Sequence, residues 1–320
     1  MTRQEIERQL AAFATSSVFS APDRGPWGDN RYRGNCTGWL IAALIRTYGV
    51  KRLAELFAGG GTGSDVARDM GIQYIGADLN PNPVRRDIIT LDAIADEVPD
   101  AFRDADFIFA HPPYGAEIRI PYAGSMYADP DGSLSRKDLG QMPWDRFMDA
   151  LNGIILKYYS AMAPGARMGL LVGNIRRNGA YHSMLTALAL PGEVVQTMVK
   201  IQHNCTSNGR EYSSRNFFTT DHEDVVVIRK PGGFLISYTV PRKREVDIRD
   251  ASRSTWKDVV RTVLQSFERP VSLSEIYNAV DGHAKTRTNP HWQEKIRQTL
   301  QTGRFFSHDS RGTWSLAPAA

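Results

Sequence analysis

The residues of this chain best suited to chemistry are the four consecutive residues His111-Pro112-Pro113-Tyr114, called here the tetrad. They follow the apolar run 107–110, which is typical of a buried strand. Two adjacent prolines fix two φ angles and remove two N–H donors, so we expect a stiff, extended segment with free carbonyl acceptors. Carbonyls that accept from an amino group, next to a ring that can stack, suit a flat nitrogen base turned out of a nucleic acid.

A glycine-rich turn lies about fifty residues before the tetrad, in the run Glu55-Leu56-Phe57-Ala58-Gly59-Gly60-Gly61-Thr62-Gly63. It joins a predicted strand, 53–57, to a predicted helix, 64–70. Glycine lets the backbone approach a ligand closely, and a helix N-terminus offers free N–H groups. Asp78 closes the next predicted strand, where a carboxylate can accept from both hydroxyls of a ribose. A structural turn or a dinucleotide site would also explain the glycines, whereas the absence of Gly-Lys-Ser/Thr disfavours a phosphate-binding loop.

Apolar runs of strand length alternate with helical patterns up to about residue 230. The predicted strands include 53–57, 73–77, 107–110, 168–172, 193–201 and 224–229, and the predicted helices include 39–48, 64–70 and 144–162. This alternation predicts an α/β fold with a Rossmann-like, mostly parallel sheet and helices on both faces. We expect this first domain to cover residues 1–240.

A charged linker is predicted at 241–252, followed by a second domain at 253–320. Apolar residues at helical spacing predict a helix at 256–267, and the capping box Ser272-Leu273-Ser274-Glu275 predicts the start of a second. A third helix is expected at 290–302, before a hairpin at 304–316. Three helices and a hairpin are typical of a winged helix.

In a winged helix the third helix usually enters the major groove of DNA, and the hairpin lies along the backbone. The cations that would then contact phosphates or base edges are Lys285, Arg287, Lys295, Arg297, Arg304 and Arg311. A protein-interaction role is the alternative. Trp256, Trp292 and Trp314 are expected in the core of this domain in either case.

The overall composition limits the class of protein. The 39 Lys and Arg residues against 35 Asp and Glu residues, with a pI near 9.0, permit a polyanionic partner without requiring one. Cys36 and Cys205 lie far apart in the sequence, so neither a disulfide framework nor a zinc site is indicated. The sequence has no long apolar run that would predict a membrane span or a signal peptide, so we expect a soluble, cytoplasmic protein. We also expect no bound metal.

Residues 25 to 230 resemble the class I S-adenosylmethionine-dependent amino-methyltransferases that act on DNA. The first motif of that family, Phe-x-Gly-x-Gly, is matched by Phe57, Gly59 and Gly61. Its catalytic motif, Asp/Asn/Ser-Pro-Pro-Tyr/Phe/Trp, is matched at three of its four places by the tetrad. A segment similar to the family's methionine-binding motif, 32–38, precedes the glycine turn, as in the gamma-ordered group.

The resemblance also implies roles for individual residues. The methionine part of S-adenosylmethionine would lie against Thr37, Glu55, Phe57, Gly59 and Gly61, its ribose against Asp78, and its adenine edge against Asp87 and Ile88. The catalytic residues would be His111, Pro112, Pro113 and Tyr114. His203 and Asn204 fall where the family often places contacts to the base, although a solvated hairpin tip would explain them equally well. The same two interpretations, ligand contact and surface turn, apply to Arg176 and Arg177.

His111 stands where the family has Asp, Asn or Ser. Two acceptors on an exocyclic amino group rotate and pyramidalise its nitrogen, which directs the lone pair at the sulfonium methyl group. A neutral imidazole can accept through one ring nitrogen and can take the released proton. The alternative is that His111 only caps a strand, in a protein that is inactive or has another substrate. For Tyr114, base stacking competes with a place in the core.

The resemblance predicts methylation of duplex DNA, with N6 of adenine favoured over N4 of cytosine. In the family, Asp or Asn before Pro-Pro-Tyr is the usual adenine signature, and Ser is the usual cytosine one. RNA or a protein glutamine amide are alternative substrates, and a DNA-binding regulator that only senses the cofactor is an alternative of another class. A restriction or defence system, with a partner subunit or a homodimer, is a possible setting.

Overall fold

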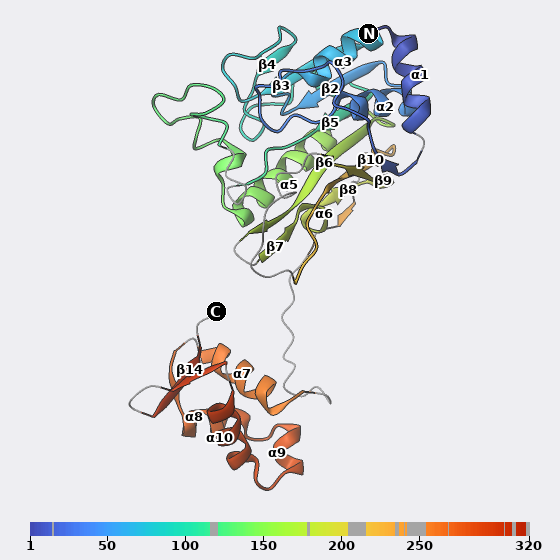
Figure 1. Cartoon of the computed structure of the whole chain (residues 1–320). Coiled ribbons are helices and arrows are strands. Elements are labelled where there is room, and N and C mark those ends of the chain that lie inside the picture. Colours follow the sequence, from blue (N-terminus) through green and yellow to red (C-terminus); the bar gives the residue numbers. More distant parts are fainter. Residues whose placement is uncertain are drawn as a thin grey trace. The chain divides into compact units, whose positions relative to one another are not determined.

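The computed structural model of the 320-residue chain describes residues 1–14, 16–115, 121–177, 180–203, 216–233, 237–239, 241, 254–267, 269–303, 305–308 and 312–317. The chain divides into two compact units, Met1–Pro241 and Arg242–Ala320 (Figure 1). Most of the predicted charged linker, 242–252, lies outside the described residues.

The first unit is built on one large sheet with the strand order β1-β9-β10-β6-β5-β2-β3-β4. Its strands are β1 (Val18–Phe19), β2 (Arg52–Leu56), β3 (Gln73–Asp78), β4 (Ile88–Thr90), β5 (Phe107–Ala110), β6 (Arg167–Arg177), β9 (Glu193–Ile201) and β10 (His222–Arg229). Neighbouring strands are parallel except at β10, which runs antiparallel to both β6 and β9. β7 (Ala180–Ser183) pairs with β6, and β8 (Leu190–Pro191) pairs with β11 (Tyr238–Thr239).

Helices cover both faces of this sheet because its central strands carry apolar side chains on both faces. In β5, Phe107 and Phe109 pack in one core, and Ile108 and Ala110 pack in the other. The first core includes α1 (Arg3–Phe13), α2 (Gly38–Tyr48) and α3 (Thr62–Met70); the second includes α4 (Asp100–Arg103), α5 (Trp144–Ala161), α6 (Met184–Ala187) and the 3-10 turn η1 (Leu139–Gln141) (Figure 1). The predicted α/β, Rossmann-like fold expected of class I methyltransferases is thus confirmed.

Several short or polar elements were not predicted. β6 continues to Arg177, five residues past the predicted end, where it pairs with β7 in a hairpin. β1, β4, α4 and α6 are each four residues or fewer, too short for a periodic signal. No helix within the described residues is both long and apolar enough to cross a membrane.

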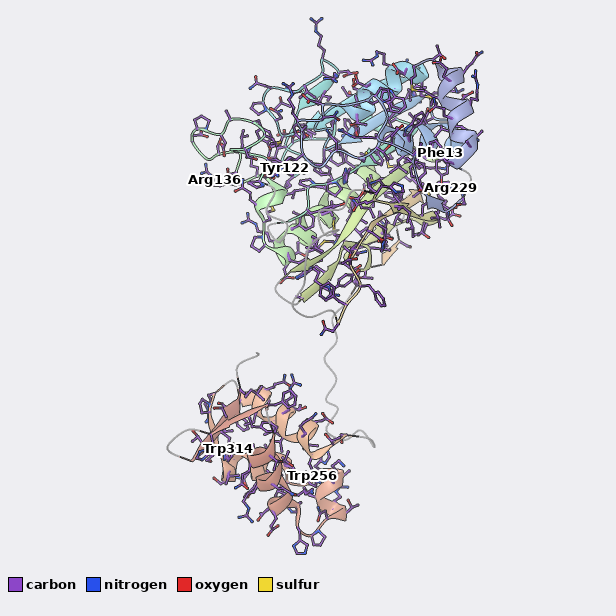
Figure 2. The ribbon with its side chains drawn as sticks, viewed as in Figure 1. Phe13, Tyr122, Arg136, Arg229, Trp256 and Trp314 are labelled. Atoms are coloured by element: carbon purple, nitrogen blue, oxygen red, sulfur yellow. The ribbon has the colours of Figure 1, made fainter. Side chains whose placement is uncertain are left out.

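The second unit contains the three predicted helices and two additional elements. Its elements are α7 (Trp256–Phe267), β12 (Val271–Ser272), α8 (Leu273–Val280), α9 (Ala284–Thr288), α10 (Trp292–Thr302), β13 (Phe306–His308) and β14 (Thr313–Leu316). The capping box of Ser272 and Glu275 begins α8 as predicted. β12 joins the predicted hairpin to give the strand order β12-β14-β13. Trp314 is buried, and Trp256 packs against the same core (Figure 2). Trp292 also packs against this core.

Candidate active site

The glycine-rich turn has a backbone that ordinary residues rarely adopt. Phe57, directly after β2, has a φ of 62°, and Gly61, the N-cap of α3, has a φ of 75°. A left-handed phenylalanine costs on the order of 1–3 kcal/mol, and such strain is concentrated at functional sites. A Cβ on Gly61 would lie 2.7 Å from the side chain of Arg85, so only glycine fits there. The turn therefore has a fixed shape beside the N-terminus of α3.

Two carboxylates lie buried at this turn, at the carboxyl end of the parallel strands. Asp78 accepts from the backbone N–H of Gly59 at 2.8 Å and from that of Asn80 at 2.9 Å, which ties the end of β3 to the turn. Burial raises the pKa of Asp78 above its usual value. Glu55 is 4% exposed and accepts from the Tyr74 hydroxyl at 2.5 Å.

Glu55 has no ion pair within the described residues, and burial raises its pKa to about 8. Close to it, Thr62 has a buried Oγ1 atom without a hydrogen-bond partner in the described part of the chain. A Cβ on Gly63 would collide with the Glu55 carboxylate, which shows how closely α3 approaches this side chain. A buried acid without an ion pair and a buried hydroxyl without a hydrogen-bond partner are unusual in a protein core, and both suit a polar, cationic ligand.

These residues line a pocket, called here the glycine-loop pocket. Its walls come from the glycine turn, the end of β3 and loops above them, namely residues 32–36, 55–59, 62, 77–79, 91–94, 111, 113, 122, 127, 137–139 and 154. Glu55, Phe57, Gly59 and Asp78 thus lie in its walls, and their contact with a cofactor stays a prediction.

Four other residues of the implied set lie elsewhere. Gly61 shapes the turn without lining the pocket, and the Thr37 hydroxyl caps α2 and donates to the carbonyls of 23 and 24. Asp87 accepts from the Ser64 hydroxyl at 2.8 Å, and Ile88 is buried in β4. Residues 91–94, just after β4, occupy the wall instead. The sequence did not indicate them because the shortness of β4 obscures where that strand ends.

Asn35 and Tyr32 connect the preceding loop to the glycine turn. The Asn35 side chain accepts from Gly60 N–H at 3.2 Å and donates to the Tyr32 carbonyl at 3.0 Å. The Tyr32 ring stacks on Tyr122, with centroids 5.9 Å apart and an interplanar angle of 28°. Tyr122 lies on the segment between β5 and α5 (Figure 2), where the buried Asp138 carboxylate accepts from its backbone N–H at 2.8 Å. None of these contacts was predicted.

The tetrad lies at the carboxyl end of β5, beside a second pocket, called here the tetrad pocket. That pocket is lined by residues 21–24, 34, 35, 37, 111, 112, 114, 122, 200–203 and 223. Gly34, Asn35, His111 and Tyr122 line both pockets. His111 therefore lies where the two pockets meet, with Pro113 facing the glycine-loop pocket.

The Tyr114 ring is half-buried and is part of a hydrogen-bonded chain. Its hydroxyl donates to Glu223 Oε1 at 2.6 Å and lies 3.4 Å from His111 Nε2. Gly173 leaves room for the ring, because a Cβ there would lie 2.9 Å from it. The Tyr114 and His111 rings meet edge to face, with centroids 5.9 Å apart. The ring thus forms a wall of the tetrad pocket, while its role in stacking stays a prediction.

Glu223 and Lys200 form a buried ion pair behind the tetrad. They are register partners in β10 and β9, and Lys200 Nζ lies 2.6 Å from Glu223 Oε2. Burial opposes ionisation of Glu223, but His111 and the Lys200 ammonium outweigh it and lower the pKa of this carboxyl below its usual value. Glu223 lies between His222 and Asp224, ahead of the apolar run 225–228, so its surroundings in the sequence do not mark it as buried. Its distance of over one hundred residues from the tetrad also hid its contact with Tyr114.

The remaining predicted contacts have separate surroundings. His203 lines the tetrad pocket, with Nε2 3.0 Å from the Ser20 hydroxyl, whereas Asn204 lies outside the described residues. The Arg176 guanidinium lies over the rings of Tyr181 and Phe217, and the Arg177 side chain is not described. No group of three or more His, Cys, Asp or Glu side chains suited to a metal occurs in the described ranges.

Four of the six cations predicted to contact DNA lie on α9 and α10. Lys285 in α9 lies over the Trp256 ring at 5.9 Å, and Arg287 is exposed on the same helix. Lys295 and Arg297 are exposed on α10, where they contact Gln298 and Glu294. Arg304 and Arg311 lie outside the described residues.

No protein-family model and no curated protein matches the sequence. Among solved structures the chain is similar to TrmN from Thermus thermophilus, with 18% identity, 62% of this chain and 50% of that chain covered, and a TM-score of 0.38. It is also similar to a SAM-dependent methyltransferase from Archaeoglobus fulgidus, with 13% identity, coverages of 62% and 96%, and a TM-score of 0.33.

A third similar structure is a proposed DNA modification methylase, also from Thermus thermophilus, solved with S-adenosyl-L-methionine, with 17% identity, coverages of 50% and 58%, and a TM-score of 0.26. The chain thus spans half the length of TrmN and little more than half of this methylase. Identities and TM-scores at this level do not assign chemistry to this chain, which has to be inferred from the side chains of the two pockets.

Proposed function

We propose that the protein is an S-adenosylmethionine-dependent methyltransferase that acts on an exocyclic amino group of a DNA base, N6 of adenine being favoured. One observation carries the proposal: His111 stands where the glycine-loop pocket and the tetrad pocket meet. A donor held in one pocket and an acceptor held in the other would therefore react beside this imidazole. Holding both partners in line is the main contribution a protein makes to such a transfer.

The side chains of the glycine-loop pocket fit the proposed cofactor. Asp78 would accept from the ribose hydroxyls. Glu55, which is buried and has no ion pair within the described residues, would pair with the ammonium of the methionine part. Residues 91–94 would border the adenine in place of Asp87 and Ile88. When bound, the cofactor supplies a methyl group on a sulfonium centre.

The tetrad would orient the amino group for methylation. A proline carbonyl of 112 or 113 and the His111 imidazole would accept its two hydrogens, and His111 would then take the proton that the methylated nitrogen releases. Tyr114 and Tyr122 both line the tetrad pocket, so either ring could support the face of the base. Because Tyr114 holds Glu223 through its hydroxyl, Tyr122 is the second stacking candidate that the structure adds.

Transfer of labelled methyl groups tests this function. The protein would be incubated with methyl-labelled cofactor and duplex DNA, and the DNA would then be digested to nucleosides. We expect label in N6-methyl-2′-deoxyadenosine. Label in N4-methylcytosine would change the target base, and label only in RNA or in protein glutamine would replace DNA as the substrate. Cofactor binding without transfer to any of these would identify a cofactor-sensing regulator.

We further propose that the second unit is a winged-helix domain that binds DNA through α10. Its exposed Lys295 and Arg297 would each contact a phosphate, since their partners on the same helix hold them only weakly. Replacing both by alanine should weaken DNA binding and reduce the slope of log K against log salt by about 2. Fluorescence anisotropy over a range of salt concentrations measures this slope.

The control variant for this measurement carries Arg46→Ala and Lys51→Ala. Both side chains are exposed, and Lys51 directly precedes β2, so it lies at the opposite end of the strands from the two pockets. The same slope in the α10 variant, the control and the unmodified protein would refute DNA contact by α10 and favour a protein-interaction role.

A further inference from the structure

We infer that Glu223, acting through Tyr114, is a positioning residue that sets the tautomer of His111, so that Nε2 carries the hydrogen and Nδ1 is the acceptor. This inference deepens the proposed function and rests on it only for the use to which Nδ1 is put. The tautomer itself follows from three contacts in the described part of the chain.

The first step is the charge state of Glu223. Its Oε2 atom lies 2.6 Å from the Lys200 ammonium, and both side chains are less than 10% exposed. A buried ammonium this close requires an ionised partner, because a neutral acid would leave the charge uncompensated. Ionised Glu223 is an acceptor at both oxygens and has no proton to donate.

The second step is the single proton of the Tyr114 hydroxyl. The hydroxyl donates this hydrogen to Glu223 Oε1, which lies 2.6 Å away. The Tyr114 oxygen can then only accept from its other neighbour, His111 Nε2, at 3.4 Å. A neutral imidazole has one N–H group, so a hydrogen on Nε2 leaves a lone pair on Nδ1.

The third step concerns the protonated state. When Nδ1 takes a proton, the imidazolium gains a full charge, and Glu223 Oε1 lies 3.7 Å from its Nε2. The buried carboxylate would stabilise that charge at short range in a site of low polarity. The network thus both presents the acceptor and stabilises the product of proton transfer. The other ionisable residues lining the tetrad pocket are Asp23 and Arg24, before α2, and His203, just after β9.

The test is the tautomer of His111 in Glu223→Gln, read from two-bond nitrogen–proton couplings in protein with 15N-labelled histidine. The His111 signals are assigned by their loss in His111→Asn. Beside Lys200, the glutamine must turn its oxygen to the ammonium and its NH2 group to Tyr114. The Tyr114 proton is then directed at His111 Nε2, so we expect the hydrogen to move to Nδ1 and turnover to fall roughly 10²-fold.

A rescue variant separates this role from a merely structural one. Adding Lys200→Met to Glu223→Gln removes the ammonium, so the glutamine oxygen can again accept from Tyr114. We expect the Nε2–H tautomer to return. The matched control is Glu193→Gln, the same substitution in the surface pair of β9 with Arg229, which should leave the tautomer unchanged.

An Nδ1–H tautomer in the unmodified protein, or the same tautomer with and without Glu223→Gln, would overturn the inference. The first of these readouts does not need Glu223→Gln, so it decides the question even if that variant does not fold. Both are measured without substrate or cofactor. Failure of methyl transfer to DNA with the expected tautomers would therefore count against the proposed function and not against this network.

Discussion

Replacing His111 by alanine should lower kcat for methyl transfer by about 10²–10⁴-fold, with little change in cofactor affinity. The imidazole lies where the two pockets meet, so alanine removes both an acceptor for the amino group and the group that takes its proton. The cofactor contacts we propose, Glu55 and Asp78, are untouched by this change. Single-turnover kinetics with DNA gives the rate, and calorimetry gives the cofactor Kd.

Two further variants test whether the loss of rate is due to the His111 acceptor. In His111→Asp, the residue common in the family restores an acceptor, so part of the lost rate should return. His203→Ala removes the other histidine of the tetrad pocket, which lies against Ser20, and should have a much smaller effect. Full activity in His111→Ala would show that His111 only ends the strand.

Replacing Glu55 by glutamine should weaken cofactor binding by about 10- to 100-fold, the equivalent of losing a hydrogen bond to a charged group. The change keeps the size of the side chain and an acceptor for Tyr74, and removes only the charge. Because the pKa of Glu55 is raised to about 8, binding of an ammonium at neutral pH should drive out a proton. Cofactor affinity of the unmodified protein should therefore increase with pH up to about 8, and this increase should vanish in Glu55→Gln.

Calorimetry in buffers of different ionisation enthalpy measures that proton directly. Glu193→Gln, at an exposed pair, should keep both the affinity and the proton release. Equal affinities of Glu55→Gln and the unmodified protein at pH 8 would contradict a contact between Glu55 and the cofactor.

The same carboxyl has a predictable effect on stability. Its folded pKa, about 8, exceeds its usual value of 4.5, so the folded state binds more protons between these values. The contribution of Glu55 to the free energy of unfolding is therefore most favourable below about pH 4.5, and it is lost as the pH rises towards 8. Near pH 8, Glu55→Gln should therefore have a higher free energy of unfolding than the unmodified protein, by on the order of a few kcal/mol, and a correspondingly higher Tm. Equal Tm values across this range would indicate that Glu55 is not desolvated.

Much of the first unit could be predicted because its signals are local. In β5 and β10, alternate apolar residues pack on opposite faces of the sheet, so both strands had to be covered by helices. The glycine turn between a strand and a helix, and Asp78 at the end of the next strand, were predicted correctly, since these elements follow one another in the chain. The roles of the site residues themselves stay predictions.

The surroundings of Asp87 and Ile88 depend on β4, a strand that the sequence did not predict. The resemblance implied that Asp87 and Ile88 border the adenine, and that role stays a prediction. In the structure Asp87 accepts from the Ser64 hydroxyl, and Ile88 is buried in β4. The chain passes through β4 and only then reaches the pocket wall at 91–94. A strand of three residues gives no periodicity from which this extra pass could be inferred.

By itself, the sequence determined the α/β fold, the glycine turn and the rigid tetrad, because backbone preferences and the alternation of apolar residues act over a few neighbouring positions. The tertiary structure alone decided what His111 faces. Antiparallel pairing of β10 with β9 and β6 sets Glu223 beside Lys200 and opposite Gly173, where the Tyr114 ring fits. The register of these strands depends on which faces are buried along their whole length, so it cannot be predicted from a short stretch of sequence.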